Sequence, residues 1–318
     1  MSFIQRLKDC NTHKESNFFK FFINNYHVGF IKKKNLNIIN KFPEIFSIKA
    51  NKIILKKEFN NFKKRTYAIN RVFNFLVNKK IISAKHREQF PVFKSFKDKP
   101  LLKVQRLAGP FFGFQFFGVH LNGFLKKNDK FFMWVGRRSA NGNFPKDLDQ
   151  IAAGGLPFNV TIKNNLIKES YEEANIHKKL ILKSKYLGTI SYRVETNLGL
   201  SRHILFCYNL ELPKDFTPKN NDGEITKFYL WPIEKILKII KESRKFKFDC
   251  ALVILLFAQN KKIIQINKIL KKLNNKSDLR ILKKLNRINK IIATTILYIT
   301  KILKFIFFNN LIKKEIVK

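Results

Sequence analysis

Two periodicities divide the chain. Apolar and polar residues alternate in short runs in the first hundred residues and again in the middle of the chain, which is typical of half-buried strands. In other segments apolar residues recur every three or four positions, which predicts helices. The predicted strands are 18–23, 29–33, 45–55, 118–124, 130–138, 186–195 and 201–212, and the predicted helices are 65–78, 234–242 and 248–260.

Breaks between these runs suggest how the chain is divided. Pro91, Pro100 and Pro110 punctuate the stretch that follows the first set of elements. The segment 196–200, with Gly199, is a hairpin signal between the last two strands. We therefore expect an accessory α+β domain over 1–110, a main domain over 111–260 and a separate tail over 261–318.

The tail consists almost entirely of Lys, Ile, Leu and Asn with helical periodicity. Residues 291–308 form an apolar run that approaches the length of a membrane span, but Lys301 and Lys304 interrupt its second half. The run predicts an amphipathic element that docks on this protein, mediates a dimer or touches a membrane surface. Disorder is the remaining alternative.

Charge changes this picture little. The chain has 64 basic and 22 acidic residues and a net charge of +42, which would ordinarily indicate a polyanionic partner. Because the excess is mostly Lys spread along the whole chain, we expect no nucleic-acid partner. Cys10, Cys207 and Cys250 are too far apart in sequence to predict a zinc site or a disulfide framework. No apolar run of signal-peptide length follows the N-terminus, so a cytoplasmic location is expected.

One acidic cluster stands out against this basic background. Glu169, Glu172 and Glu173 lie at i, i+3 and i+4, so on a helix their Cβ atoms would be about 5–6 Å apart. Three carboxylates so close repel one another, and hard divalent cations with oxygen ligands would compensate. A loop containing Gly154 and Gly155 precedes this helix, and Asn175 stands where it should end.

These residues resemble the box of the Nudix hydrolases, which begins with a Gly and ends on a helix with Arg-Glu and Glu-Glu pairs. The match consists of Gly154, Glu169, Glu172, Glu173 and Ile176. The chain departs from the box at the first Glu, the Arg, the aliphatic residue and the second Gly, which are Val160, Lys168, Ser170 and Asn175. The loss of the first Glu and the Arg leaves the rigidity of the loop in question.

Further runs are similar to a subgroup, the Nudix segment fused to thiamine pyrophosphokinase in fungi. The runs are 118–124, 134–139, 144–157, 211–225 and 248–257, and 6–11 and 86–92 are similar to its accessory N-terminal domain. The resemblance implies a Nudix α/β/α sandwich with a mixed sheet, preceded by a small α+β domain and followed here by a helical basic tail. The fold class is therefore α+β.

The resemblance also implies a Mg²⁺-dependent pyrophosphohydrolase, with Mn²⁺ as a second metal, that cleaves a small organic diphosphate. Thiamine diphosphate or its damaged analogues would give the monophosphate and phosphate. Glu169, Glu172 and Glu173 would bind metal, and Glu224 after the Asp222-Gly223 turn would complete the catalytic set. The remaining implied residues are Arg137, Arg138, His120 and Asn122 for substrate and Gly154, Gly155 and Lys168 for the loop.

Besides a basic RNA- or membrane-associated protein whose tail is the working part, two alternatives stay open at this point. One is a Nudix hydrolase of nucleotide-type substrates or RNA, because the box itself specifies only a diphosphate linked to another group. The other is a Nudix-fold binding protein without catalysis, which the replacements at Val160 and Lys168 would favour. The retained glutamates argue against the second alternative.

Overall fold

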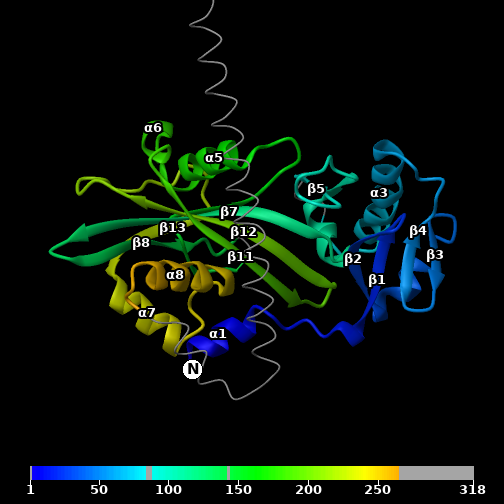
Figure 1. Ribbon diagram of the computed structural model, residues 1–318, viewed down its shortest axis with the longest axis horizontal. Coiled ribbons are helices and arrows are strands. Elements are labelled where there is room, and N and C mark those ends of the chain that lie inside the picture. The colour runs from blue at the N-terminus through cyan, green and yellow to red at the C-terminus, as the bar shows by residue number, and fades with distance from the viewer. Residues whose placement is uncertain (1, 84–87, 142–143, 265–318) are drawn as a thin grey trace, which may run out of the picture.

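The computed structural model describes residues 2–83, 88–141 and 144–264. It is an α+β protein with a large mixed sheet at one end and a smaller mixed sheet at the other (Figure 1). The dimer and membrane-surface contacts expected of the tail, and its helices, fall on 265–318 and lie outside the described residues.

The large sheet has seven strands in the order β11-β12-β7-β8-β13, with β10 paired to β7 and β9 to β8. Strands β12 and β7 run parallel, and the other pairs are antiparallel. A turn joins the strands expected over 118–124 and 130–138, and the predicted hairpin at 196–200 is present. The strands are β7 (Gln115–Lys127), β8 (Lys130–Arg138), β9 (Leu148–Asp149), β10 (Ala152–Gly155), β11 (Lys185–Glu195), β12 (Leu200–Glu211) and β13 (Ile225–Pro232).

Helices cover both faces of this sheet, as the sandwich prediction required (Figure 1). Helix α5 (Ile162–Ala174) packs on β7 and β10, with the short α6 (Lys178–Ile181) beside it. Helices α7 (Ile233–Glu242) and α8 (Phe248–Asn260) lie on the opposite face. Leu166 of α5 and Val119 of β7 share one apolar core, while Phe124 and Ile254 belong to the core under α8.

The N-terminal helix belongs to this sandwich and not to the accessory unit. Helix α1 (Phe3–Asp9) packs against α7 and α8. The buried guanidinium of Arg6 donates to the carbonyl of Phe246 at 2.6 Å, and Asp9 pairs with Arg244 at 3.1 Å. The first ten residues therefore pack with the sandwich, so a single domain boundary at residue 110 does not describe them. Local sequence could not show this, because contacts between residues so far apart in the chain form only when it folds.

The accessory unit contains a four-stranded sheet in the order β2-β1-β4-β3, covered by α3, and a two-stranded ribbon. Helix α3 follows the N-cap residue Asn61, whose side chain accepts a hydrogen bond from the amide of Lys64. The elements are β1 (Phe18–Ile23), β2 (Tyr26–Lys32), β3 (Phe46–Lys49), β4 (Lys52–Leu55), β5 (Gln89–Val92), β6 (Leu102–Gln105), α2 (Leu36–Ile39), α3 (Phe62–Asn78), α4 (Gly109–Phe112) and the 3₁₀ turns η1 (Glu15–Asn17), η2 (Lys33–Asn35) and η3 (Arg106–Ala108).

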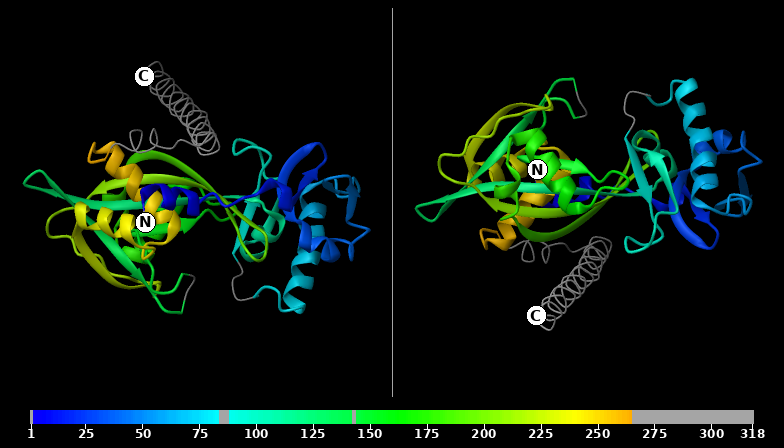
Figure 2. Two further views of the ribbon diagram at one scale, coloured as in Figure 1. Left: turned by 90° about the horizontal axis from the view of Figure 1, so that it is seen from below. Right: turned by 90° about the horizontal axis from the view of Figure 1, so that it is seen from above.

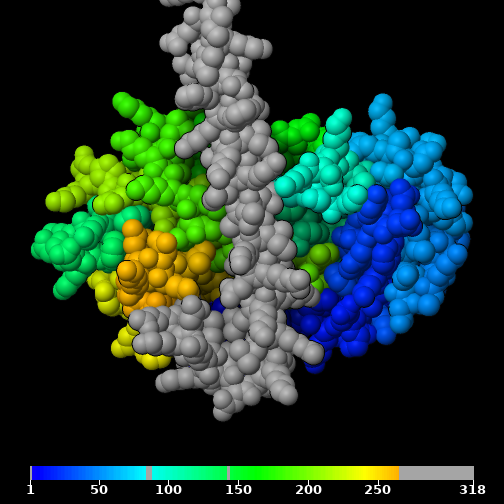
Figure 3. Space-filling model, in the orientation of Figure 1, coloured from blue at the N-terminus to red at the C-terminus, as the bar shows by residue number. Residues whose placement is uncertain are grey.

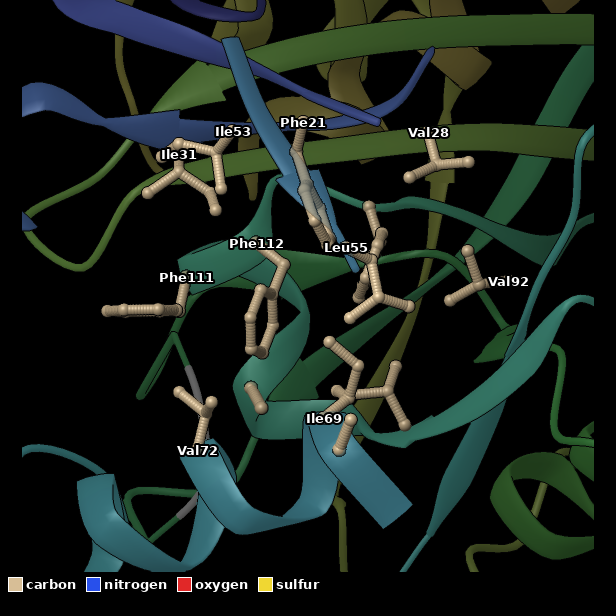
Figure 4. Packing of buried hydrophobic residues seen from close by; sticks show 14 of the residues in the cluster. Phe21, Val28, Ile31, Ile53, Leu55, Ile69, Val72, Val92, Phe111 and Phe112 are labelled. Atoms are coloured by element: carbon tan, nitrogen blue, oxygen red, sulfur yellow. The ribbon is translucent and has the colours of Figure 1, made fainter. Parts of the chain in front are cut away.

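A continuous apolar core ties this unit to the sandwich. Phe21, Ile69 and Phe112 point toward one another in the centre of the accessory unit (Figure 4), and the same core extends to Phe116 of β7. The accessory unit lies beyond one end of the large sheet and covers neither of its faces (Figure 2). The segment around β5 lies beside the strands of the accessory unit in the space-filling view (Figure 3). Within the described ranges, no helix combines the length and hydrophobicity that crossing a membrane would need.

Candidate functional site

Helix α5 presents the acidic cluster. The Thr161 side chain accepts a hydrogen bond from the amide of Asn164 at 3.2 Å, which caps the first turn. Asn175 ends the helix in the left-handed conformation, with φ of 53°. This confirms the predicted helix and its Asn stop. The predicted glycine loop is partly wrong, because Gly154 and Gly155 lie in strand β10, paired with β7.

Glu169 and Glu173 are buried on the face of α5 that packs against β10. The Oε2 of Glu173 accepts a hydrogen bond from the Ala153 amide at 3.0 Å. Burial raises the pKa of Glu173 well above its usual range, and the charges of Asp149, Glu169 and Glu224 raise it further. Burial also raises the pKa of Glu169 to about 7. The two carboxyl groups are therefore poised to be neutralised by a cation.

Gly154 and Asn165 set the approach of the helix to the strand. A Cβ on Gly154 would lie 2.1 Å from Cδ of Glu169, so only glycine leaves room for this carboxylate. The fully buried Asn165 donates to the carbonyl of Gly155 at 2.9 Å. A Cβ on Gly155 would instead meet the ring of Phe90 from the accessory unit, 2.3 Å away.

Lys168 lies between two of the carboxylates. Its Nζ is 3.2 Å from Oε1 of Glu169 and 2.8 Å from Oε2 of Glu172. Burial by itself would lower the pKa of Lys168, but the two carboxylates outweigh burial and raise it. With Val160 in place of the first Glu of the box, Lys168 has no carboxylate there to bind. Val160 packs into the apolar core instead.

Glu224 comes from the opposite side of the site. Its amide donates to Oδ1 of Asp222 at 2.8 Å, so the predicted turn is formed. Its Oε2 lies 3.3 Å from Nη2 of Arg138, and Nη1 of Arg138 binds the buried Asp149 at 2.9 Å. Burial lowers the pKa of Arg138 by itself, but Asp149 and Glu224 raise it overall. Arg138 thus joins strands β8 and β9 to Glu224.

The four residues expected to contact substrate differ in position. Arg137 is exposed and precedes Arg138 in β8, whereas Arg138 could clamp phosphate only by leaving its two carboxylates. The burial of His120 and Asn122 gives no support to substrate contact, which stays a prediction. Both are buried, and they bind Gln150 and Asn209 respectively. Alternation along β7 turns them away from α5, toward α8.

Sequence reasoning missed three residues of the site. Asp149 anchors Arg138, Asn165 anchors β10, and Glu88 of the accessory unit lies close enough for its charge to raise the pKa of Glu169. Each is a single polar residue in an unremarkable run, so no local pattern marks it. Only the packing of distant segments brings Asp149 and Glu88 to the site and joins Asn165, which lies on α5 itself, to β10.

The residues fit a divalent cation by their chemistry more than by their present arrangement. In the part of the chain that the structure describes, no three His, Cys, Asp or Glu side chains converge as a metal cluster. The ammonium group of Lys168 separates Glu169 from Glu172, and Glu173 is turned toward Ala153. Yet buried carboxylates beside further carboxylates form a donor set that hard divalent ions satisfy. Metal binding by Glu169, Glu172 and Glu173 stays a prediction.

Comparison with solved structures finds matches of low sequence identity. A structure from Deinococcus radiodurans has 20% sequence identity and a TM-score of 0.40, covering 53% of this chain and 98% of that one. The Nudix domain of NrtR from Shewanella oneidensis, solved with ADP ribose, has 13% identity and a TM-score of 0.37, covering 46% of this chain and 88% of that one.

Sequence comparison is more specific. A family model described as a domain of unknown function, DUF4743, matches residues 2–115. An uncharacterized protein of Saccharomyces cerevisiae, YJR142W, is 28% identical over 72% of this chain and 73% of its own length. Two chloroplastic proteins of Arabidopsis thaliana, Nudix hydrolase 24 and Nudix hydrolase 20, are 35% and 34% identical, each over 80% of this chain and 71% of the relative. On this similarity over most of both chains, the protein belongs to the Nudix hydrolase family and is a pyrophosphohydrolase.

Proposed function

We propose that this enzyme hydrolyses the diphosphate of a small organic molecule with the help of Mg²⁺ or Mn²⁺, and that thiamine diphosphate or a damaged analogue is the substrate. The observation that carries the chemistry is the pair of buried carboxylates, Glu169 and Glu173, beside Glu172 on one face of α5. Water would attack one phosphorus and the bond from that phosphorus to the bridging oxygen would break, giving the monophosphate and phosphate.

Each side chain of the site would have a different role in the reaction. Glu169, Glu172 and Glu173 would hold the metal, which when bound would neutralise phosphate oxygens and lower the pKa of a bound water. Nη2 of Arg138 lies 3.3 Å from Oε2 of Glu224 and orients this carboxylate, which would accept a proton from the attacking water. The exposed guanidinium of Arg137 is available to pair with phosphate oxygens.

Support for thiamine comes from the resemblance of the seven runs to the thiamine pyrophosphokinase-linked subgroup. The accessory unit adjoins the site, because the buried ring of Phe90 packs on Gly155 and the charge of Glu88 raises the pKa of Glu169. A cytoplasmic location belongs to the same proposal.

The test is release of phosphate from a panel of diphosphates, with and without Mg²⁺. The panel should contain thiamine diphosphate, its oxidised analogues, ADP-ribose, a sugar nucleotide and capped RNA. Selective release from the thiamine compounds is expected. Activity confined to other members would retain the chemistry and reject the substrate, and no release from any member would reject hydrolysis of these diphosphates and favour a binding role.

Glu173→Gln tests the site directly. Removing this buried carboxylate should lower the rate by about a hundredfold or more while the protein stays folded, because a metal ligand is lost without a change of shape. Glu234→Gln, a change of the same kind at the exposed start of α7, should leave the rate unchanged. A Glu173→Gln enzyme as active as the parent would show that the site lies elsewhere.

A further inference from the structure

Two arginines face each other where the large sheet meets the accessory unit. Arg193 of β11 and Arg202 of β12 are direct partners in the antiparallel register. Directly opposed residues of the same charge destabilise such a pair of strands. The far end of this hairpin reaches the accessory unit (Figure 1), where Lys32 and Asn35 bind the carbonyls of Thr196 and Leu198.

The contacts of Arg202 do not neutralise its charge. Nη1 donates to the carbonyls of Gly113 at 2.9 Å and Val28 at 3.5 Å, and the guanidinium lies over the ring of Phe30 at 5.0 Å. Burial, followed by the charge of Arg193, lowers the pKa of Arg202 to about 9, so the group stays charged at neutral pH. A charge held away from water without a counter-ion is costly.

The nearest acidic side chains serve other cations. Glu195 binds Lys32 at 2.9 Å and also accepts from Asn17. Glu15 binds Lys20 at 3.0 Å. Burial lowers the pKa of Arg193, and the charge of Glu15 raises it and so partly offsets that arginine, whereas burial and the charge of Arg193 both lower the pKa of Arg202.

Two polar atoms at this junction are buried and have no hydrogen-bond partner among the described residues. They are Nε of Arg202 and Nε2 of His13. The ring of His13 packs edge-on against the same Phe30 at 4.9 Å, so both groups border one aromatic side chain. Burial lowers the pKa of His13 to about 4, followed by the charges of Arg193 and Arg202. At neutral pH the imidazole is therefore uncharged and can still donate one N–H.

We propose that Arg193, Arg202 and His13 form a binding site for a small phosphate anion, either inorganic phosphate or the terminal group of a phosphomonoester. Guanidinium groups match the geometry of phosphate oxygens, and the neutral imidazole adds a donor without needing a counter-charge. The ligand would sit between the N-terminal segment, β2 and the β11–β12 hairpin. It would therefore stabilise the junction between the accessory unit and the sandwich.

The experiment follows thermal unfolding of the full-length protein in chelator, so that metal-bound phosphate at the acidic helix plays no part. Inorganic phosphate should raise the melting temperature by about 2–4 °C relative to sodium chloride of equal ionic strength. Calorimetric titration with inorganic phosphate and with glycerol phosphate measures affinity directly. If both compounds bind, the site accepts the terminal group of a phosphomonoester. If inorganic phosphate alone binds, the ligand is the free ion.

The substitution Arg193→Met distinguishes a phosphate-binding role of Arg193 and Arg202 from a purely structural one. Without phosphate it should melt above the parent, since a like charge is removed, and its affinity for phosphate should fall by about tenfold or more. Arg202→Met should also lose the response, and Arg71→Met, at an exposed pair with Glu44, should keep it. A parent that phosphate does not stabilise, or an Arg193→Met protein that responds like the parent, would overturn the proposal.

Discussion

At the scale of single residues, the site is governed by how buried carboxylates are neutralised. Glu173 has a backbone amide as a donor, whereas Glu169 and Glu172 share the ammonium group of Lys168. In the family box an Arg stands at this position and the first Glu is present. Here Val160 removes that acid, so the cation turns toward the two remaining glutamates. Lys168 consequently competes with any metal for the same oxygens.

Lys168→Met should therefore bind Mn²⁺ more tightly, by about fivefold, because a half-exposed ion pair contributes at most about 1 kcal/mol. Its melting temperature in chelator should fall, since two carboxylates lose their counter-ion. Calorimetric titration with Mn²⁺ measures the first effect. Lys163→Met, an exposed change on the same helix, is the control. Weaker Mn²⁺ binding by Lys168→Met would mean that the lysine organises the site as the family Arg is expected to.

At the scale of secondary structure, the site depends on how closely α5 approaches β10. Gly154 removes the side chain that would collide with Glu169, and Asn165 fastens the helix to the next residue of the strand. Gly155 does the same for the ring of Phe90, which belongs to the accessory unit. Gly154 thus leaves room for a carboxylate of the candidate site, and Gly155 leaves room for an aromatic ring of the accessory unit.

Gly154→Ala should lose both stability and metal binding. The added methyl group displaces Glu169, and overpacking of this kind costs about 1–3 kcal/mol. Gly155→Ala is the matched comparison, because it should lower stability while leaving Glu169 in place. Chemical denaturation and Mn²⁺ titration of both variants separate the effects. Equal loss of Mn²⁺ affinity in the two variants would contradict the assignment of Gly154.

At the scale of the whole molecule, polar groups buried far from α5 make stability depend on pH. His203 stacks on Tyr192 at 4.9 Å, under α8. Burial lowers the pKa of His203 from 6.5 to about 3. Between these values the unfolded chain binds more protons than the folded one. The stabilisation is complete above pH 6.5 and is lost as the pH falls toward 3.

His203→Phe should flatten the fall of stability between pH 6.5 and pH 4, because no proton then has to be excluded from this position. The midpoint of urea denaturation at several pH values measures the slope. His177→Gln, at an exposed histidine, should leave the slope as in the parent. An unchanged slope in His203→Phe would assign the acid sensitivity to other groups.

Whether the tail contributes to catalysis is a question about the whole molecule. A chain that ends at residue 264 retains every helix and strand that the structure describes. It should hydrolyse the diphosphate as fast as the full chain, since the residues of the candidate site lie within 88–224. Steady-state phosphate release from both chains is the measurement. A large loss in the shorter chain would show that the tail takes part in catalysis.

The sequence by itself determined the local elements and the chemical class. Periodicity predicted the main helices and strands because burial on one face leaves a direct trace in the order of residues. The spacing of Glu169, Glu172 and Glu173 predicted one acidic helix face, because i, i+3 and i+4 positions adjoin on any helix.

The tertiary structure alone decided which side chains reach that face. It turned His120 and Asn122 to the other side of the sheet, paired Arg138 with Asp149 and placed α1 on the sandwich. It also brought Arg202 against the accessory unit. These are contacts between residues far apart in the chain or on opposite faces of a strand. Local sequence carries no record of them, because they arise only when packed layers fix the register and the facing of each strand.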